Sequence, residues 1–382
     1  MQKHETVGTI CSKLSHWFPL DLAGSWDNTG LLLGSSCNKV NRILFCLTIT
    51  KSVCEEAIER NVDMIVSHHP IMLKPVKKLT DDSHESWIIR RLCKHDISVY
   101  CPHTAHDNAI HGINEQLARL LGLENVRPIY PHKRKANTKL VVFVPKNHAD
   151  SVASAVFYAG GGVIGKYSGC SFRTDGIGTF FGETGSNPAI GVPGTSQSVP
   201  EIRLEIIVPN HLVSIAVSEM KSVHPYEEPA YDIIPLAEET ANEGEGRFGQ
   251  LPYPVQLGVI AKHTADILAA DMVQCIGDLL KEIKTVAIGC GAAGEWVRIC
   301  PTIGADLFIT GEMKYHDMLL AHQTGTSVLV IGHYASESFS MKTLMKRVES
   351  EFPDVEMFQT ATDHFVSQWI GRREIFTCPK SD

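Results

Sequence analysis

The segment Val62-Asp63-Met64-Ile65-Val66-Ser67-His68-His69-Pro70 decides the fold class of this sequence. Its first five residues are mostly apolar, which is typical of a strand buried on both faces of a parallel sheet. Neighbouring side chains of an ideal strand point to opposite faces. At the end of a strand, next to Pro70, both imidazoles can instead turn towards one site. The segment therefore predicts a buried strand that carries His68 and His69 at its carboxyl end.

Strands and helices alternate on both sides of this segment. The apolar runs Asn41–Ile49 and Ile97–Tyr100 predict two further buried strands. Apolar residues recur at helical spacing in Ser52–Asn61, Ser86–His95 and Asn114–Leu121. This alternation predicts a mostly parallel sheet covered by helices.

The same order of elements returns near the C-terminal end. The predicted strands are Thr285–Ile288, Asp306–Thr310 and Ser327–Ile331, and the predicted helices are His316–Thr324 and Glu337–Glu349. We therefore expect residues 1–125 and 251–382 to form one α/β domain with a mostly parallel sheet, split by an insertion at residues 126–250.

The middle of the chain contains an internal repeat of a strand, a proline and a helix. Leu140–Pro145 precedes the helical stretch Ala149–Tyr158, and Arg203–Pro209 precedes the helical stretch His211–Lys221. Two such halves predict a small ferredoxin-like α+β domain. The Gly-, Ser- and Pro-rich stretch 182–198 is expected to be a loop, and the acidic stretch 238–246 a linker back to the first domain.

Composition excludes several classes of protein. The chain has 382 residues, about twice the usual domain size, so two domains are expected. Its formal net charge of −8 argues against broad contact with a nucleic-acid backbone. No apolar run reaches the roughly 20 residues of a membrane helix, and no secretion signal is recognisable. The 11 cysteines are an odd number without C-x-x-C spacing, which favours reduced thiols in a cytoplasmic protein.

Histidines and acids follow four predicted strands at the point where each strand ends. They are His68 and His69, His103 and Asp107, Glu312, and His333 and Glu337. Ligands of open α/β sheets bind at the carboxyl ends of strands. If a helix begins directly after each strand, residues four apart share a face, which brings His103 near Asp107 and His333 near Glu337.

This residue set predicts metal binding. A single histidine is usually a surface or core residue, but four strand ends delivering imidazoles and carboxylates to one edge are hard to obtain by chance. Mixed imidazole and carboxylate ligands suit Zn²⁺, Fe²⁺, Mn²⁺ or Co²⁺. The set is too large for one tetrahedral ion, so two cations about 3.5–4 Å apart, bridged by a carboxylate and a water or hydroxide, fit better.

These motifs, in their order along the chain, resemble the Nif-three-like family, also labelled GTP cyclohydrolase 1 type 2. The matching segments are Trp26–Leu31, Val62–Pro70, Pro102–Asp107, Gly246–Gly249, Thr310–Met313 and Gly332–Glu337. The resemblance implies that His68, His69, Asp107, His333 and Glu337 hold two divalent cations, with Glu337 bridging both. It also implies a toroidal homo-hexamer.

The sequence departs from the family at one motif. Ala105-His106 stands where the family often has Asn-Leu, so His106 either adds a polar group near the metals or points outward. We expect His103 to support the ligands without binding a cation itself. We therefore expect His103 and His106 to lie next to the metal ligands without being ligands themselves.

The insertion resembles the PII- and CutA-like domain that the family's long form carries. Its segment 224–232 contains a histidine and acids, but two prolines indicate an extended turn before the last strand. We expect this domain to make subunit contacts or to restrict access to the ring cavity.

A glycine-rich segment follows one of the C-terminal strands. Gly289–Gly294 matches G-x-G-x-x-G, the dinucleotide fingerprint, but only a short helix fits between it and the next strand. Two interpretations stay open at this point: an anion cradle of backbone N–H groups beside the metals, or close packing.

Two functional hypotheses follow. In the first, the protein is a metal-dependent hydrolase in which a metal-bridging hydroxide attacks a nucleotide, as the family's GTP cyclohydrolase label implies, with Glu312 and His316 transferring protons. In the second, it is a non-catalytic metal-binding or regulatory scaffold with protein partners.

Overall fold

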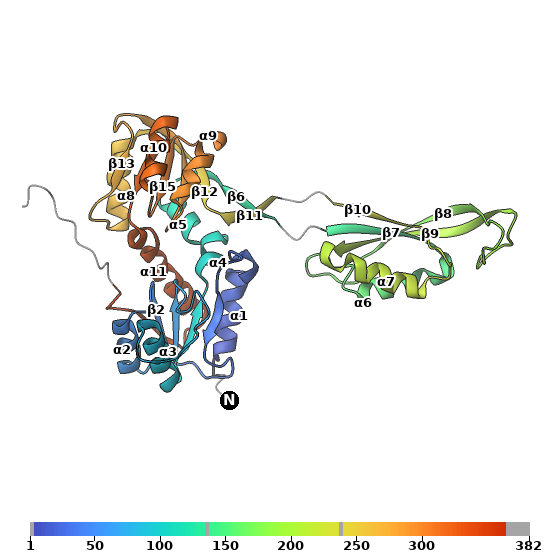
Figure 1. Cartoon of the computed structure of the whole chain (residues 1–382), viewed down its shortest axis with the longest axis horizontal. Helices are drawn as coiled ribbons and strands as arrows, with labels where there is room; N and C mark the ends of the chain where they lie inside the picture. The colour runs from blue at the N-terminus through green and yellow to red at the C-terminus, as the bar shows by residue number, and fades with distance from the viewer. Residues whose placement is uncertain (1–3, 134–136, 237–239, 364–382) are drawn as a thin grey trace, which may run out of the picture. The chain divides into compact units, whose positions relative to one another are not determined.

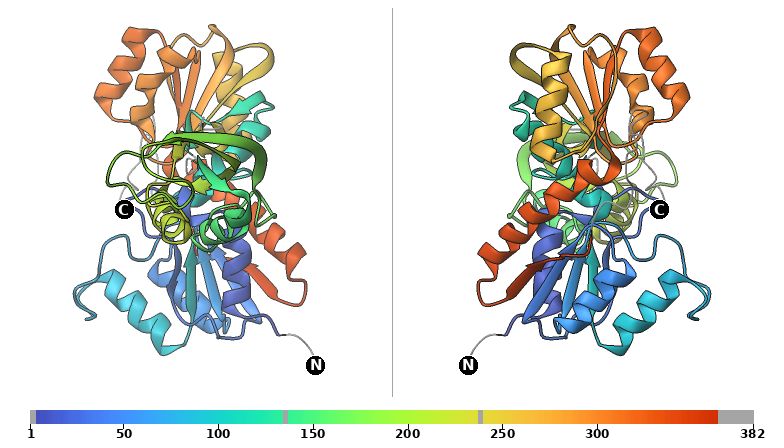
Figure 2. Two further views of the ribbon diagram at one scale, coloured as in Figure 1. Left: turned by 90° about the vertical axis from the view of Figure 1, so that its right-hand side faces the viewer. Right: turned by 90° about the vertical axis from the view of Figure 1, so that its left-hand side faces the viewer.

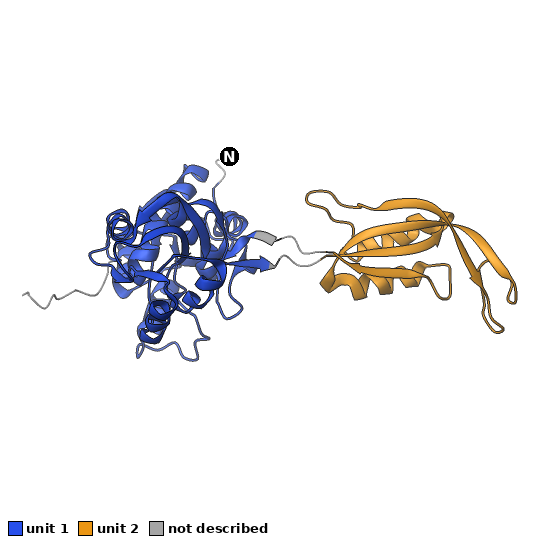
Figure 3. Ribbon diagram, turned by 90° about the horizontal axis from the view of Figure 1, so that it is seen from above, with its two compact units in different colours: residues 1–132, 242–382 blue, residues 133–241 orange. Residues whose placement is uncertain are grey.

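The computed structural model describes residues 4–133, 137–236 and 240–363. The chain divides into two compact units, which Figure 3 colours separately. Unit 1 comprises residues 1–132 and 242–382, and unit 2 comprises residues 133–241. In the described part of the chain, no helix has the length and apolar character to cross a membrane.

Unit 1 contains a five-stranded sheet that is mostly parallel (Figure 1). Its strand order is β1 (Gly30–Leu33), β4 (Ser98–Cys101), β3 (Met64–Ser67), β2 (Arg42–Cys46) and β17 (Glu356–Gln359). Only β1 runs antiparallel to its neighbour. The three central strands are buried along almost their whole length, because helices cover both faces of the sheet.

Alternate residues of β2 pack against different helices. Ile43 and Phe45 belong to an apolar cluster with α1 (Val7–Trp17) and α11 (His333–Glu351). Leu44 and Cys46 belong to a second cluster with α2 (Lys51–Glu59) and α3 (His84–Lys94). The sheet is therefore the middle layer of three, and its carboxyl edge is the part left for a site.

The second sheet of unit 1 has six strands and is only half parallel. Its order is β13 (Gln274–Ile276), β16 (Ser327–Val330), β15 (Leu307–Thr310), β14 (Glu282–Gly289), β12 (Arg247–Gln256) and β5 (Glu124–Arg127). Only β14, β15 and β16 are parallel. The prediction of one shared sheet for both ends of the chain is thus wrong. An apolar run shows that a strand is buried but does not show which strands lie beside it.

Four helices cover this second sheet on its two faces. They are α5 (Ile113–Leu120) and α8 (Leu257–Leu268) on one face, and α9 (Cys300–Ile303) and α10 (Tyr315–Thr324) on the other. The long helix α11 runs from one sheet of unit 1 to the other (Figure 2). Its Met341 packs in the core of the first sheet and its Phe339 against the core of the second. Helix α11 therefore carries its first turn into the region between the carboxyl edges.

Unit 2 has a four-stranded antiparallel sheet with two helices. The chain order is β7 (Asn137–Pro145), α6 (Ala149–Tyr158), β8 (Phe172–Phe181), β9 (Ser196–Pro209), α7 (Val213–Val223) and β10 (Tyr231–Pro235). The strand order is β10-β7-β9-β8, and both helices pack on the same apolar face of the sheet (Figure 1). The acidic stretch predicted as a linker contains a strand, β11 (Thr240–Glu245), which pairs with β6 (Tyr130–Lys133).

Candidate metal centre

Three chain segments bring the predicted ligands together in unit 1. His68 and His69 follow β3, and their backbone N–H groups donate to Cys46 and Leu47 beside the end of β2. Asp107 lies on the short helix α4 (His103–Asn108), which begins two residues after β4. His333 is the first residue of α11, and Glu337 lies one turn further along that helix. The prediction that residues four apart share a face is confirmed for His333 and Glu337, whose Nε2 and Oε2 atoms are 3.2 Å apart.

The carboxylate of Glu337 is the centre of the group. Its Oε2 atom lies 3.0 Å from His69 Nε2, 3.2 Å from His333 Nε2 and 3.8 Å from His68 Nε2. On the other side of His68, Asp107 Oδ1 is 3.8 Å from the same Nε2 atom. Glu337 therefore contacts imidazoles that belong to two neighbouring sets of ligand atoms.

Within the described residues, two three-residue groups have ligand atoms close enough to hold a cation. One group is His69, His333 and Glu337, and the other is His68, His69 and His103. Within each group, the ligand atoms lie within 4.8 Å of one another. His69 belongs to both groups, so the two candidate positions are adjacent.

Burial and charge shift the titration of these groups. Burial and the nearby Glu337 raise the pKa of Asp107 well above its usual value. Burial lowers the pKa of His68 well below its usual value. Burial alone would raise the pKa of Glu337, but the charge on His68 and hydrogen bonds from His333 and His69 lower it below the ordinary range. A hydrogen bond to Glu337 raises the pKa of His333 to about 9 against the opposing effect of burial.

Orphaned polar atoms show that the residues fit a cation. Among the described residues, neither ring nitrogen of the fully buried His68 has a hydrogen-bond partner, and neither does Asp107 Oδ1. Buried polar atoms nearly always have a hydrogen-bond partner, so these unpaired atoms require an explanation. A bound cation would satisfy His68 Nε2 and Asp107 Oδ1, which lie 3.8 Å apart, and imidazole and carboxylate are ligands that Zn²⁺, Fe²⁺, Mn²⁺ and Co²⁺ accept.

Outer hydrogen bonds orient the imidazoles. The Nδ1 atom of His69 is 2.7 Å from Thr48 Oγ1, that of His103 is 2.7 Å from Asp27 Oδ1, and that of His333 is 2.9 Å from Glu312 Oε1. Such partners fix the ring and leave Nε2 free for a metal. Neither Thr48 nor Asp27 is predicted from the sequence to take part in the site, although Asp27 lies in the family-like segment Trp26–Leu31.

The glycine-rich segment packs closely against Glu337. A Cβ atom on Gly291, which has a φ of +64°, would lie 2.3 Å from Glu337 Oε1. The N–H groups of Cys290 and Gly291 donate to Asn114 and Ser336. These two N–H groups are therefore not directed towards an anion, and close approach explains the glycine.

A buried arginine holds the turn that follows Asp107. Arg247 is 1 % exposed, and its guanidinium donates to the carbonyl oxygens of Asn108 and Ala109. It also lies 3.6 Å from Glu115. These contacts give a physical role to the family-like segment Gly246–Gly249.

The remaining predicted residues lie at different depths. Glu312 reaches His333, and its side chain is 60 % exposed. His316 is exposed on α10, and its ring contacts that of Tyr315. None of the described hydrogen bonds or ion pairs joins His316 to the ligand group.

His106 does not point outward, because it is fully buried with its ring 4.4 Å from that of Phe18 and 6.0 Å from that of His68. Burial lowers the pKa of His106 to about 3.

Comparison with known proteins assigns the chain to a family. The family model described as Duf34/NIF3 (NGG1p interacting factor 3) matches residues 5–364. The chain belongs to the Duf34/NIF3 family.

Members of the Duf34/NIF3 family and their relatives match most of the chain. A Halalkalibacterium halodurans protein named GTP cyclohydrolase 1 type 2 homolog is 36% identical over 85% of this chain and 87% of its own length. A Bacillus subtilis protein of the same name is 34% identical over 95% of this chain and 98% of its own length. The crystal structure of a Bacillus cereus protein related to NIF3 covers 97% of this chain and 100% of its own, with 31% identity and a TM-score of 0.71.

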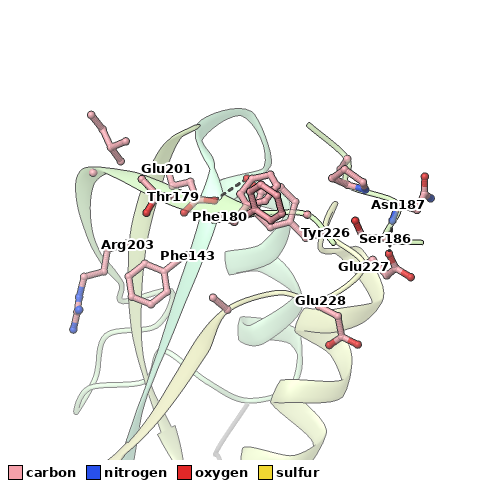
Figure 4. Close-up of a pocket in the computed structure, with 18 of the residues that line it drawn as sticks. Phe143, Thr179, Phe180, Ser186, Asn187, Glu201, Arg203, Tyr226, Glu227 and Glu228 are labelled. Atoms are coloured by element: carbon pink, nitrogen blue, oxygen red, sulfur yellow. Dashed lines mark hydrogen bonds between the residues drawn. The ribbon is translucent and has the colours of Figure 1, made fainter. Parts of the chain in front are cut away.

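Unit 2 has a separate pocket of about 730 Å³ (Figure 4). Phe143, Phe180 and Tyr226 contribute to its largely apolar wall, and the Tyr226 hydroxyl donates to Glu201 at 2.7 Å. All of its lining residues belong to unit 2, and none is a predicted metal ligand. This volume is in the usual range for small-molecule sites.

Proposed function

We propose that this chain is a dinuclear metal-dependent hydrolase that acts on a nucleotide. The observation that carries the proposal is the contact of the Glu337 carboxylate with the imidazoles of His68, His69 and His333. Two divalent cations, Zn, Fe, Mn or Co, would be held by His68, His69, Asp107, His333 and Glu337, with Glu337 bridging them. When bound, such a pair supplies water that is a nucleophile at neutral pH.

The residues of the chain position the ligands and move protons. Thr48 and Glu312 fix the outer nitrogens of His69 and His333. Glu312 is exposed and contacts the site, which suits transfer of a proton between the site and solvent. His316 is a second candidate for proton transfer, because it lies on α10, which follows the end of β15.

Two observations support a nucleotide as the substrate class. The relatives named above are called GTP cyclohydrolase 1 type 2 homologs. Trp26 is 63 % exposed, and its ring meets the His103 ring edge-on at 5.9 Å. An exposed indole beside the ligand group offers a surface on which a planar base can stack.

We further propose a cytoplasmic toroidal homo-hexamer in which unit 2 is an insertion of the ferredoxin-like, PII- and CutA-like type. The strand order β10-β7-β9-β8, with one helix after β7 and one after β9, supports this assignment. The role of unit 2 would be to make subunit contacts or restrict access to the ring cavity.

The pocket of unit 2 favours a second candidate function, a non-catalytic metal-binding or regulatory scaffold. A compact unit with its own apolar core and a pocket of ligand size suits a sensor that reports a small molecule to protein partners.

Elemental analysis of the protein at known subunit concentration tests the metal centre. We expect about two divalent cations per chain, and near-zero content in Glu337→Gln and Asp107→Asn because each variant removes a buried charged ligand. His322→Asn, an exposed histidine of α10, is the control and should keep its cations. Near-zero metal in the unaltered protein, purified without chelators, would contradict the proposal.

Nucleotide turnover separates the two functions. A hydrolase that carries its cations should open the imidazole ring of GTP with release of formate, and the Glu337→Gln variant should not. Protein that is fully loaded with metal but leaves GTP and other nucleotides unchanged would be the scaffold.

A further inference from the structure

We propose that His103 is a direct ligand of one of the two cations, held in place by Asp27. This inference rests on the metal centre proposed above and adds a sixth protein ligand to it. The sequence placed His103 behind the ligands, but the structure places its ring among theirs.

The position of the ring carries the first part of the argument. A ligand nitrogen of His103 lies within 4.8 Å of ligand nitrogens of both His68 and His69. The His103 ring centre is 5.3 Å from that of His68 and 5.8 Å from that of His69. Two ligands on opposite sides of a cation are about 4 Å apart when each metal–nitrogen bond is about 2.0–2.1 Å. Small side-chain rotations would therefore bring the three imidazoles onto one ion.

Asp27 determines which nitrogen faces the group. Its side chain is fully buried, and its Oδ1 atom lies 2.7 Å from His103 Nδ1. Its Oδ2 atom accepts hydrogen bonds from the backbone N–H and the hydroxyl of Thr104. A carboxylate paired with Nδ1 keeps the proton on that nitrogen and leaves the lone pair on Nε2, as second-shell carboxylates do for metal-bound histidines.

The backbone at His103 carries the third part of the argument. His103 has a φ of +32°, although it is not glycine. Residues held in such conformations cost of order 1–3 kcal/mol and cluster at functional sites. At this position the turn lets one short helix carry both His103 and, four residues on, Asp107.

The ligand count is consistent with the assignment. With Glu337 shared, six protein groups give one cation three ligands and the other four. Catalytic cations commonly use three protein ligands and keep a position for water or substrate. His103 therefore completes the first coordination sphere and still leaves room for a substrate.

Titration with Co²⁺ tests this assignment, because the visible spectrum of Co²⁺ depends on its coordination sphere. The informative variant is His103→Asn, since asparagine tolerates a positive φ better than most residues. We expect it to lose one of two cations, or to bind one of them at least 100-fold more weakly, with an altered spectrum. Asp27→Asn should weaken the same cation about 10- to 100-fold. The control His322→Asn should match the unaltered protein.

Each outcome has a distinct meaning. Two cations bound by a folded His103→Asn protein with unchanged affinities and spectrum would overturn the inference and leave the dinuclear centre intact. If His103→Asn does not fold, the Asp27→Asn titration decides, and unchanged affinities in that variant would overturn the inference. An unaltered protein that binds no Co²⁺ would instead contradict the metal centre itself.

Discussion

At the scale of single residues, spacing predicts which groups meet but not how they are oriented. His333 and Glu337 are four residues apart on one helix, so their contact follows from helix geometry. Hydrogen bonds that orient the rings join residues far apart in the sequence. Thr48 and His69 are 21 residues apart, and Asp27 and His103 are 76 residues apart. No local periodicity reports such hydrogen bonds. The sequence therefore predicts which histidines and acids come together, but it does not reveal Thr48 and Asp27, which orient two of the rings.

Gly291 gives a prediction at this scale. Replacing it with alanine would strain a left-handed residue and place a Cβ atom 2.3 Å from Glu337 Oε1. We expect Gly291→Ala to lose roughly 1–2 kcal/mol of unfolding free energy through the backbone and also to lose bound metal, because Glu337 must move. Chemical denaturation and elemental analysis measure the two effects.

Gly304→Ala is the matched control. Gly304 has a φ of +72°, and no atom lies within 4 Å of the position its Cβ would take. We expect a similar loss of stability and full metal content. Equal metal content in the two variants would show that the close approach of Gly291 to Glu337 has no consequence for binding.

At the scale of elements, the central strands are predictable and the edge strands are not. Strand β3 was predicted at residues 62–66 and lies at Met64–Ser67, because burial on both faces leaves a clear apolar run. Strand β17 has only half-buried and exposed residues, and β12 contains two prolines. Neither has a run that stands out from a loop, and their absence from the prediction is one reason why two sheets were taken for one.

The segment after β17 connects the first sheet to the candidate metal centre. Glu56 is 7 % exposed and accepts hydrogen bonds from Thr360, Ala361 and Thr362. Asp363 accepts from the backbone N–H groups of Leu47 and Thr48, and the Thr48 hydroxyl contacts His69. The segment therefore holds the loop that orients a predicted ligand.

This anchor predicts a dependence on pH. Burial alone would raise the pKa of Glu56, but hydrogen bonds from residues 360–362 and the charge of Arg60 lower it below the ordinary value of 4.5. A lowered carboxyl pKa stabilises the fold above the unfolded value, and this stabilisation is lost as pH falls through the folded value. We expect Glu56→Gln to reduce the loss of unfolding free energy between about pH 5 and pH 3. Denaturant titrations at several pH values measure it.

Glu55→Gln provides the comparison, since Glu55 is exposed on the same helix turn. It should keep the acid sensitivity of the unaltered protein. If Glu56→Gln and Glu55→Gln show the same pH profile, the anchor does not contribute to acid unfolding.

At the scale of the whole molecule, the two units have separate cores. The apolar cluster of unit 2 is built from β7, β9, α6 and α7. The other four clusters contain residues of unit 1 only. Residues 132 and 242, where unit 1 is interrupted, lie on the paired strands β6 and β11. Each unit therefore buries an apolar core of its own, which an independently folding domain needs.

We expect unit 1 to fold without unit 2. A chain in which a turn of about two residues replaces 133–241 should unfold cooperatively and keep its metal content, because β-hairpin turns of this length are common. Circular dichroism and elemental analysis measure these properties. A shortened chain that is unfolded, or that folds without metal, would show that the centre of unit 1 depends on unit 2.

The contact between His69 and Glu337 joins residues 268 positions apart, and β2 is completed at its outer edge by β17. Domains generally fold as units during synthesis, N-terminal first. During synthesis, all strands of unit 2 are made before the second part of unit 1, which begins at residue 242. A nascent chain would thus carry a folded unit 2 while unit 1 is still incomplete, and the proposed cations could bind only after His333 and Glu337 have been synthesised.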